Sequence, residues 1–322
     1  YFTGIVRDKI GRKMSKQLGN SPDPLDLIAQ YGADGMRVAM LLSSSAGNDV
    51  MFDEALCEQG RNFGNKIWNA YRLVNGWTVD GTLAQSDNDR LAGEWFRQTL
   101  RRAVAELDGD FGSYRISEAF MLLYKLFWDD FSGWYLEMIK PAYGAPIDPR
   151  TVDEAKGFFD ALLRLLHPFM PFITEELFMH IQDEEETIMT SQWPVYKEEW
   201  NFKENEAEID AIKEAVRNIR NIRAEMNVAP SKKVHVYVVS ENEGVRYIFE
   251  HSKVFFKTLA HASEVTVQAD KAGIGEDAVS VVVQDATIYM PLAELVDFAK
   301  EIERLEKEKT KLEKEVDRVV KK

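Results

Sequence analysis

A helical repeat of apolar side chains constrains the fold of this chain more than any other feature. Between about residues 53 and 140, apolar and aromatic residues recur every three or four positions, which is the spacing of a buried helix face. Two such series cover 96–107 and 116–138, and a third, over 158–180, contains two prolines that can kink or break it. The spacing predicts a mainly α chain built on a helical bundle rich in aromatic residues.

The period changes to two after a further helix predicted over 208–227. Valines then alternate with other residues, which is the pattern of strands with one buried face. A helix predicted over 244–260 separates the first two strands. The strand-like stretches are 234–238, 265–267, 279–283 and 288–290. We therefore expect a small α/β unit after the bundle.

The end of the chain shows a third pattern. From Leu295 to Val319, apolar residues keep steps of three and four, and residues 292–322 hold nine acidic and nine basic side chains. This combination predicts a coiled-coil helix. No partner helix follows it in this sequence.

The chain is acidic overall, with a net charge of −14 from 40 basic and 54 acidic residues. This balance argues against a protein that binds nucleic acid through bulk electrostatic attraction. Two segments reverse it: residues 1–20 hold five basic residues against one acidic residue, and residues 211–233 hold six against two. Local basic faces are therefore expected within an acidic chain.

Composition excludes several classes of site. No apolar run reaches the roughly 20 residues that a membrane span needs. The single cysteine, Cys57, excludes an internal disulfide, and the five histidines show no zinc-ligand spacing. We therefore expect no membrane segment and no bound metal, and the reducing cytoplasm is the expected compartment. The first residue is tyrosine rather than methionine, so we expect a piece of a longer protein.

The most chemically informative stretch is a basic loop, residues 7–20, which follows a strand predicted over 1–6. Lys13 and Lys16 flank Ser15, and a glycine lies on either side. Such a loop can bring cations and a hydroxyl group to a polyphosphate, where they stabilise the charge that develops during phosphoryl or nucleotidyl transfer. By composition alone, such a run more often marks a solvated surface turn.

The order of residues in this loop resembles the KMSKS signature of class I aminoacyl-tRNA synthetases. Residues 13–16 match its first four positions, whereas Gln17 replaces the final serine. Further stretches resemble the Val/Ile/Leu subgroup in the same order, and 220–232 resembles its valyl branch in particular, as does a terminal coiled coil. These stretches are 18–20 (LGN), 31–37 (YGADGMR), 61–70 (RNFGNKIWNA), 127–135 (FWDDFSGWY), 167–177 (HPFMPFITEEL) and 220–232 (RNIRAEMNVAPSK).

The resemblance implies four parts. Residues 1–58 would end a catalytic domain that carries the KMSKS-like loop, and 59–205 would form a helical anticodon-binding bundle. Residues 206–291 would form a small α/β appendage, and 292–322 would begin a coiled-coil arm that contacts tRNA.

The resemblance also implies a reaction: valine is activated by ATP, with Mg²⁺, and then transferred to the tRNA for valine. Lys13 and Lys16 would hold the ATP phosphates as pyrophosphate leaves. Ser15 would contact phosphate or order the loop, and Met14 would lie beneath it. The sequence contains no His-x-Gly-His, the family's second signature. This piece alone is therefore expected to be inactive and to bind no cofactor tightly, whereas the full-length enzyme would act as a cytoplasmic monomer.

Basic side chains on three predicted helices are candidate contacts for tRNA phosphates. Lys213, Arg217 and Arg220 share one predicted stripe beside an apolar helix face. The other candidates are Arg61 and Lys66 on one helix and Arg97, Arg101 and Arg102 on another. Salt bridges to nearby acidic residues are the alternative for each. The large aromatic residues Trp95, Phe127, Trp128 and Tyr135 are expected in the core rather than as platforms for bases.

Two alternative functions remain open from the sequence. The first is an isoleucyl- or leucyl-tRNA synthetase, although the absence of cysteine pairs disfavours isoleucyl forms that end in a zinc module. The second is a non-catalytic RNA-binding or scaffold protein that keeps synthetase-like helices. A His-x-Gly-His motif and an inserted editing domain upstream of Tyr1 would exclude the second alternative, and their absence from the full-length protein would contradict the enzyme interpretation.

Overall fold

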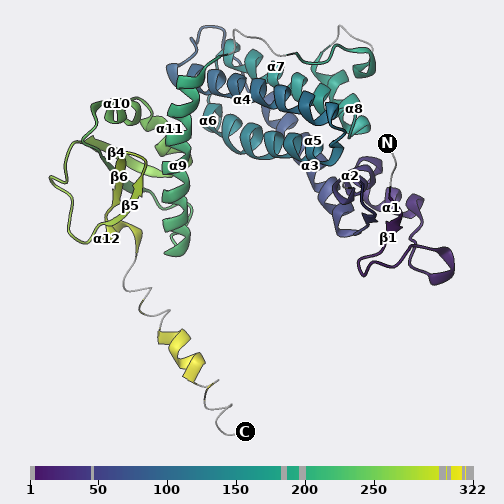
Figure 1. The fold of residues 1–322 in the computed structure, drawn as a ribbon. Helices are drawn as coiled ribbons and strands as arrows, with labels where there is room; N and C mark the ends of the chain where they lie inside the picture. Colours follow the sequence, from purple (N-terminus) through teal and green to yellow (C-terminus); the bar gives the residue numbers. More distant parts are fainter. Residues whose placement is uncertain are drawn as a thin grey trace. The chain divides into compact units, whose positions relative to one another are not determined.

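The computed structural model describes residues 4–44, 47–182, 187–195, 201–296 and 306–313, together with residues 302 and 316. The chain divides into two compact units, Tyr1–Glu206 and Ala207–Lys322. Helices make up most of the first unit, and the second combines helices with a small sheet (Figure 1). The mainly α fold predicted from the apolar spacing is confirmed.

The first unit begins with a short pair of parallel strands that carries the basic loop. Strand β1 (Val6–Arg7) pairs with β2 (Val50–Met51). Between them lie the 3-10 helix η1 (Lys16–Leu18) and the helices α1 (Pro24–Tyr31) and α2 (Ala33–Ser43). The strand predicted over 1–6 is thus displaced toward the loop, and residues 1–3 lie outside the described residues.

Local sequence explains why α1 and α2 are separate helices. Asp23 caps α1 by accepting a hydrogen bond from the Leu25 N–H (2.9 Å). Pro24 occupies the first helical position, where no N–H is needed. Gly32 then takes a φ of 79°, which side chains disfavour, and the chain turns into α2.

The helical bundle follows directly. Its elements are α3 (Ala55–Asn75), α4 (Asp87–Gly112), α5 (Ile116–Lys125), the π-helix η2 (Leu126–Tyr135), α6 (Leu136–Ile139), α7 (Pro149–Leu166), α8 (Pro171–Ile181) and the 3-10 helix η3 (Ile188–Thr190). Aromatic rings fill the core. Phe96 contacts Phe131, Tyr135 and Phe158 with ring centroids 5.0 to 5.3 Å apart.

Two of the predicted bundle helices differ in detail from the structure. The helix predicted over 116–138 is continuous, but its middle section, η2, has π-helical hydrogen bonding. The helix predicted over 158–180 is two helices, because α7 ends at Leu166 and α8 begins at Pro171. Pro168 and Pro171 have no N–H with which to continue the helical hydrogen bonds.

The boundary between the two units lies within α9 (Lys203–Glu225). The second unit has a four-stranded sheet in the order β4-β3-β6-β5, in which β3 pairs in parallel with β4 and the other pairs are antiparallel. The strands are β3 (Val234–Val239), β4 (Ala262–Gln268), β5 (Val279–Val283) and β6 (Ala286–Met290). All four strand-like stretches are thereby confirmed.

The connection between β3 and β4 contains two helices rather than the single one predicted. They are α10 (Glu243–His251) and α11 (Lys253–Leu259), and Ser252 separates them. Both contribute buried phenylalanines: Phe249 comes from α10, and Phe255 and Phe256 come from α11. The α/β character expected for this unit is confirmed.

The predicted coiled-coil segment, 292–322, lies largely outside the described residues. Its first turn forms α12 (Leu292–Leu295), in which Leu295 is buried. Beyond it, the described seam residues Ile302, Leu312 and Val316 are exposed. None of the helices in the described parts of the chain is both long enough and apolar enough to cross a bilayer.

Candidate functional site

The basic loop (residues 7–20) returns alongside the strand that precedes it. The Met14 N–H donates to the Val6 carbonyl oxygen (3.1 Å). The turn between these residues closes at Gly11, whose φ is 82° and whose N–H donates to the Asp8 carbonyl oxygen (2.9 Å). Backbone hydrogen bonds therefore define the path of the first half of the loop.

Asp8 and Asn20 join the two ends of the loop. Asn20 Nδ2 donates to Asp8 Oδ2 (3.0 Å) and to the Lys13 carbonyl oxygen (3.3 Å). Asn20 Oδ1 accepts from the Ser15 N–H (2.9 Å). The hydrogen bond from Asn20, followed by those from Arg12, lowers the pKa of Asp8 to about 2. We call this arrangement the Asp8–Asn20 clasp; sequence analysis did not identify it as part of the site.

Ser15 and Gly19 shape the segment that carries Lys16. The Ser15 hydroxyl oxygen accepts from the Leu18 N–H (3.2 Å) and so caps η1. Gly19 ends this short helix with a φ of 65°. Lys16 is the first residue of η1, and its position on the loop follows from this cap. In this structure, the Ser15 hydroxyl group therefore orders the loop.

Lys13 and Lys16 present their side chains to solvent. Arg12, their neighbour, pairs with the Asp8 carboxylate (2.7 Å). Among the described residues, by contrast, neither Lys13 nor Lys16 forms an ion pair within 4.0 Å. Two uncompensated positive charges on a hydrogen-bonded loop are suited to binding an anion with several oxygens.

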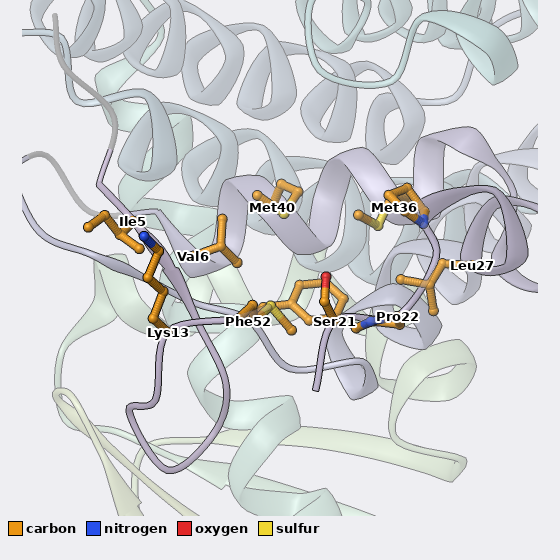
Figure 2. A pocket seen from close by; sticks show the side chains of 11 residues that line it. Ile5, Val6, Lys13, Ser21, Pro22, Leu27, Met36, Met40 and Phe52 are labelled. Carbon is orange, nitrogen blue, oxygen red and sulfur yellow. The ribbon is translucent and has the colours of Figure 1, made fainter. Parts of the chain in front are cut away.

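A cavity of about 420 Å³ lies next to the loop (Figure 2). Lys13 and Ile5 lie at one end of it and Met36 and Leu27 at the other (Figure 2). Met14 lines the cavity and is half-buried against a small apolar cluster. A volume of this size is typical of sites for small organic groups. The loop thus places a cation beside an apolar cavity.

No metal centre accompanies the loop in the described parts of the chain. There, no group of three or more His, Cys, Asp or Glu side chains is arranged to hold a metal ion. Cys57 is fully buried. Burial raises the pKa of its thiol, which disfavours the reactive thiolate.

The candidate tRNA contacts on α4 are engaged within the first unit. Arg97 pairs with Glu154 at 2.7 Å, and only 22% of its side chain is exposed. Arg101 donates to Asn201 (3.0 Å) and to Gln98. Arg102 pairs with Glu206. The contacts of Arg97 and Arg102 correspond to the salt-bridging alternative, most fully for Arg97, whose partner is also largely buried, whereas the two partners of Arg101 are neutral amides.

The candidates on α3 remain at the surface. Arg61 is exposed, pairs with Glu58 (3.3 Å) and lies over the ring of Tyr31, 5.5 Å from its centroid. Lys66 lies over the ring of Trp128 at 5.4 Å. Each aromatic ring attracts the cation above it through a cation–π interaction but does not cancel its charge.

The stripe predicted on α9 contains only two of its three residues. Arg217 and Arg220 are exposed, and Arg220 Nε donates to the Leu259 carbonyl oxygen (2.8 Å). Lys213 instead is 5% exposed and lies 4.0 Å from Asp210. Its spacing of four and seven positions from Arg217 and Arg220 would place all three on one side of the helix, so the three residues differ in burial and not in spacing.

The aromatic residues of the bundle mostly occupy its core, as expected. Trp95, Phe127 and Tyr135 are at most 1% exposed, which excludes them as platforms for bases. Trp128 is half-buried and stacks on Tyr124, with ring centroids 5.5 Å apart. The bundle therefore presents one of the four aromatic residues, beside Lys66, at its surface.

Comparisons with known proteins match both parts of the site. Residues 1–53, which include the basic loop, match the family described as class I tRNA synthetases (I, L, M and V). Residues 93–238 match the family described as the anticodon-binding domain of tRNA ligase.

Curated relatives match almost the whole chain. It is 48% identical over 316 residues to the valine–tRNA ligase of Parabacteroides distasonis, which covers 96% of this chain and 34% of the relative. It is 51% identical over 310 residues to that of Phocaeicola vulgatus (95% and 34%) and 40% identical over 335 residues to that of Clostridium acetobutylicum (100% and 37%). The chain thus spans about a third of the length of these relatives.

Among solved structures, the LeuRS–tRNA–LeuAMS ternary complex of Agrobacterium radiobacter K84 aligns with a TM-score of 0.48 and 19% identity, over 74% of this chain and 26% of that chain. The family matches and the curated relatives agree with the order of motifs along the sequence. The chain is a part of a class I tRNA synthetase and belongs to the valine–tRNA ligase family.

Proposed function

We propose that the full-length enzyme containing this chain activates valine with ATP and transfers the valyl group to the tRNA for valine. The chain supplies the phosphate-binding loop and the anticodon-binding bundle. The observation that carries the proposal is the alignment of 95–96% of the chain with valine–tRNA ligases, with two lysines, on the loop that matches the synthetase signature, that form no ion pair with the described residues.

In the activation step, a carboxylate oxygen of valine bonds to the α-phosphorus of ATP, and the bond to the β-phosphate bridging oxygen breaks. Negative charge grows on the departing pyrophosphate, where Lys13 and Lys16 act as placed cations. The Asp8–Asn20 clasp and the Ser15 cap reduce the reorganisation that binding requires of the loop. Mg²⁺ accompanying ATP would add to the neutralisation of the phosphate charge that Lys13 and Lys16 provide.

In the transfer step, a hydroxyl oxygen of the terminal tRNA ribose bonds to the valyl carbonyl carbon, and AMP leaves. The chain contributes tRNA binding to this step. Arg61 and Lys66 on α3 and Arg217 and Arg220 on α9 are our candidates for phosphate contacts, supported by the exposure of the three arginines and the partial exposure of Lys66. Burial and ion pairing favour a structural role for Arg97 and Lys213.

We further propose that the full-length enzyme is a cytoplasmic monomer, as expected from the sequence. Of the alternatives, an isoleucyl or leucyl enzyme is not favoured, because the relatives that match along the chain are valine–tRNA ligases. The other alternative, a non-catalytic scaffold protein, would not activate any amino acid.

The test is amino-acid-dependent exchange between pyrophosphate and ATP in the full-length enzyme, run in parallel with valine, isoleucine and leucine. We expect exchange with valine at the highest kcat/KM. A preference for isoleucine or leucine would refute the valine assignment, and no exchange with any of the three would favour the scaffold.

A further inference from the structure

The stretch that most resembles the valyl branch, residues 220–232, forms the end of α9 and the turn that leads into β3. The helix ends where Asn227 takes a φ of 52° and the Val228 N–H donates to the Arg223 carbonyl oxygen (2.8 Å). Arg223 Nη2 then donates to three carbonyl oxygens of the turn, and the shortest of these hydrogen bonds is to Lys232 (2.6 Å). This stretch therefore fixes where α9 meets the start of the sheet.

Backbone contacts bring further basic residues to the same edge of the sheet. β3 and β4 are parallel, so their first residues lie at one edge. The Val234 N–H donates to the His261 carbonyl oxygen (3.3 Å), and Arg220 Nε donates to the Leu259 carbonyl oxygen (2.8 Å), two residues before His261. Lys233 directly precedes β3. We call the resulting group the strand-start cluster: Arg220, Arg223, Lys233 and His261.

The strand-start cluster holds positive charge that the described residues do not neutralise. Among them, Arg223, Lys233 and His261 form no ion pair within 4.0 Å. Glu294, which contacts β3 near its start, is engaged by the His235 N–H (2.7 Å). The pKa of His261 is lowered, first by burial and then by the positive charges of the other three members. Such repulsion between like charges is relieved when an anion lies beside them.

Arg223 adds a buried donor to the cluster. It is 5% exposed, and burial lowers the pKa of its guanidinium group. Its Nη2 donates to the turn, whereas its Nη1 is buried and has no acceptor among the described residues. A buried charged donor without an acceptor costs free energy. An anion with several oxygens would supply this acceptor together with the opposite charge.

A structural role explains only part of the cluster. Basic side chains near the C-terminus of a helix commonly bind carbonyl groups there, and Arg223 does so with the turn after α9. Lys233 and His261 instead precede the two strands and are exposed. Exposed cations that gather beside a buried one are suited to binding an oxyanion.

We propose that the strand-start cluster binds a phosphate group. Arg220 and Lys233 supply permanent charge, His261 supplies a further donor when protonated, and Arg223 supplies the buried donor. The phosphate group belongs either to the tRNA backbone, in which case the inference rests on the proposed function, or to free phosphate, in which case it does not. The site lies wholly within the second unit and does not include the basic loop.

Three variants of the full-length enzyme test the site. Lys233→Gln removes a charge from an exposed side chain. His261→Asn removes the imidazole at a residue whose φ is 54°, which asparagine tolerates better than most side chains. Lys271→Gln is the matched control, because it removes an exposed lysine just beyond the opposite end of β4. Arg223 is left unchanged because it holds the turn before β3.

The first measurement is the dissociation constant of the tRNA for valine across a KCl series. Lys233→Gln should lower the salt slope by about 1, and Lys271→Gln should leave it unchanged. A phosphate beside His261 raises the pKa of this residue, so binding takes up a proton and strengthens as the pH falls. His261→Asn should therefore weaken binding by about tenfold at about pH 6 and little at about pH 8, relative to wild type.

The second measurement needs no tRNA. Inorganic phosphate is titrated into wild type carrying ¹³C-labelled histidine, with KCl at equal ionic strength as the reference. The resonance that disappears in His261→Asn belongs to His261. We expect phosphate to shift this resonance in wild type and in Lys271→Gln, and to shift it at least about fivefold less readily in Lys233→Gln, because one of the placed charges is lost.

The outcomes separate the two sources of phosphate. A reduced salt slope in Lys233→Gln supports the tRNA backbone, whereas an unchanged slope with a phosphate-dependent shift of His261 supports free phosphate. The proposal is overturned if neither effect occurs, or if Lys271→Gln reproduces the effects of Lys233→Gln. A wild-type enzyme without valine-dependent exchange refutes the proposed function instead, and the titration with inorganic phosphate is independent of that result.

Discussion

Replacing Gly60 with alanine should force α3 away from α2. A Cβ atom at this position would lie 2.8 Å from the Gly35 carbonyl oxygen, 2.8 Å from the Val38 Cβ and 2.9 Å from the Gly35 Cα. Backbone atoms of Gly35 cannot rotate away as the end of a flexible side chain can. Gly64, about one turn further along α3, is the matched control, because its added Cβ would meet only the Met170 Cε at 3.8 Å.

The magnitudes follow from these distances. Glycine to alanine within a helix gains about 1 kcal/mol from helix propensity, which is the full expected effect at Gly64. At Gly60, overpacking costs about 1–3 kcal/mol, and contact with backbone favours the upper part of that range. The free energy of unfolding should therefore fall by ~1–2 kcal/mol for Gly60→Ala, which lowers Tm by roughly 2–8 °C for a unit of this size. Gly64→Ala should raise Tm by roughly 2–4 °C.

Tryptophan fluorescence during heating isolates the relevant unit, since all seven tryptophans lie within Tyr1–Glu206. The two variants should shift Tm in opposite directions. If Gly60→Ala stabilises the chain as much as Gly64→Ala does, α2 and α3 are not in backbone contact at Gly35, and the reasoning from these distances is wrong.

Three other predictions concern the loop and the tRNA surface. Lys16→Ala in the full-length enzyme should slow valine-dependent pyrophosphate exchange by about 10²- to 10³-fold, as for the loss of one placed donor; an unchanged rate would contradict its role. Asn20→Ala should raise the pKa of Asp8 from about 2 toward its ordinary value of 3.8, measured by NMR titration. Because the folded-state pKa is depressed, stabilisation by this carboxylate is present above pH 3.8 and is lost as the pH falls through about 2. Changing Arg217 and Arg220 to alanine should weaken tRNA binding and lower the salt slope by about 1 for each residue; an unchanged slope would assign them to structure.

Most of the helical fold could be predicted because its signal is periodic. A buried helix face and a buried strand face each impose their own spacing on apolar residues, and the bundle and the four strands follow from it. The π-helical section η2 could not be predicted in this way. Its apolar and aromatic residues recur at nearly the spacing of an α-helix, so the sequence pattern does not distinguish the two kinds of helix. Within η2, Phe131 contacts Phe96 and Phe159 on other helices.

The candidate site shows where charge alone misleads. Lys213 belongs to a basic stripe by residue type, yet it lies four residues after Ile209 and three before Val216, both fully buried. Arg220 likewise lies four residues after the buried Val216 and is exposed, so helical spacing alone does not distinguish the two residues. Residue type thus predicted the sign of the charge but not its exposure. No sequence signal predicts the Asp8–Asn20 clasp, because loop residues have no regular spacing from which a contact between side chains could be inferred.

The hydrogen bonds between α2 and the segment that leads into α8 show the harder limit. The Asp34 carboxylate accepts from the N–H groups of Phe172 (3.3 Å) and Ile173 (2.8 Å), and Arg37 donates to the carbonyl oxygens of Pro168 (2.9 Å) and Phe169 (3.0 Å). The two halves of this contact, YGADGMR and HPFMPFI, are both recognisable in the sequence, but nothing within either segment specifies the other as its partner. The physical reason is that each half carries hydrogen-bonding groups whose partners lie in the other half. Asp34 and Arg37 are charged groups at the start of a helix, and the turn at 167–172 offers carbonyl and N–H groups that two prolines leave without helical partners. Hydrogen-bond satisfaction therefore predicts that each half needs a partner, and the tertiary packing of α2, which includes its close approach to α3 at Gly35 and Gly60, brings the partners together.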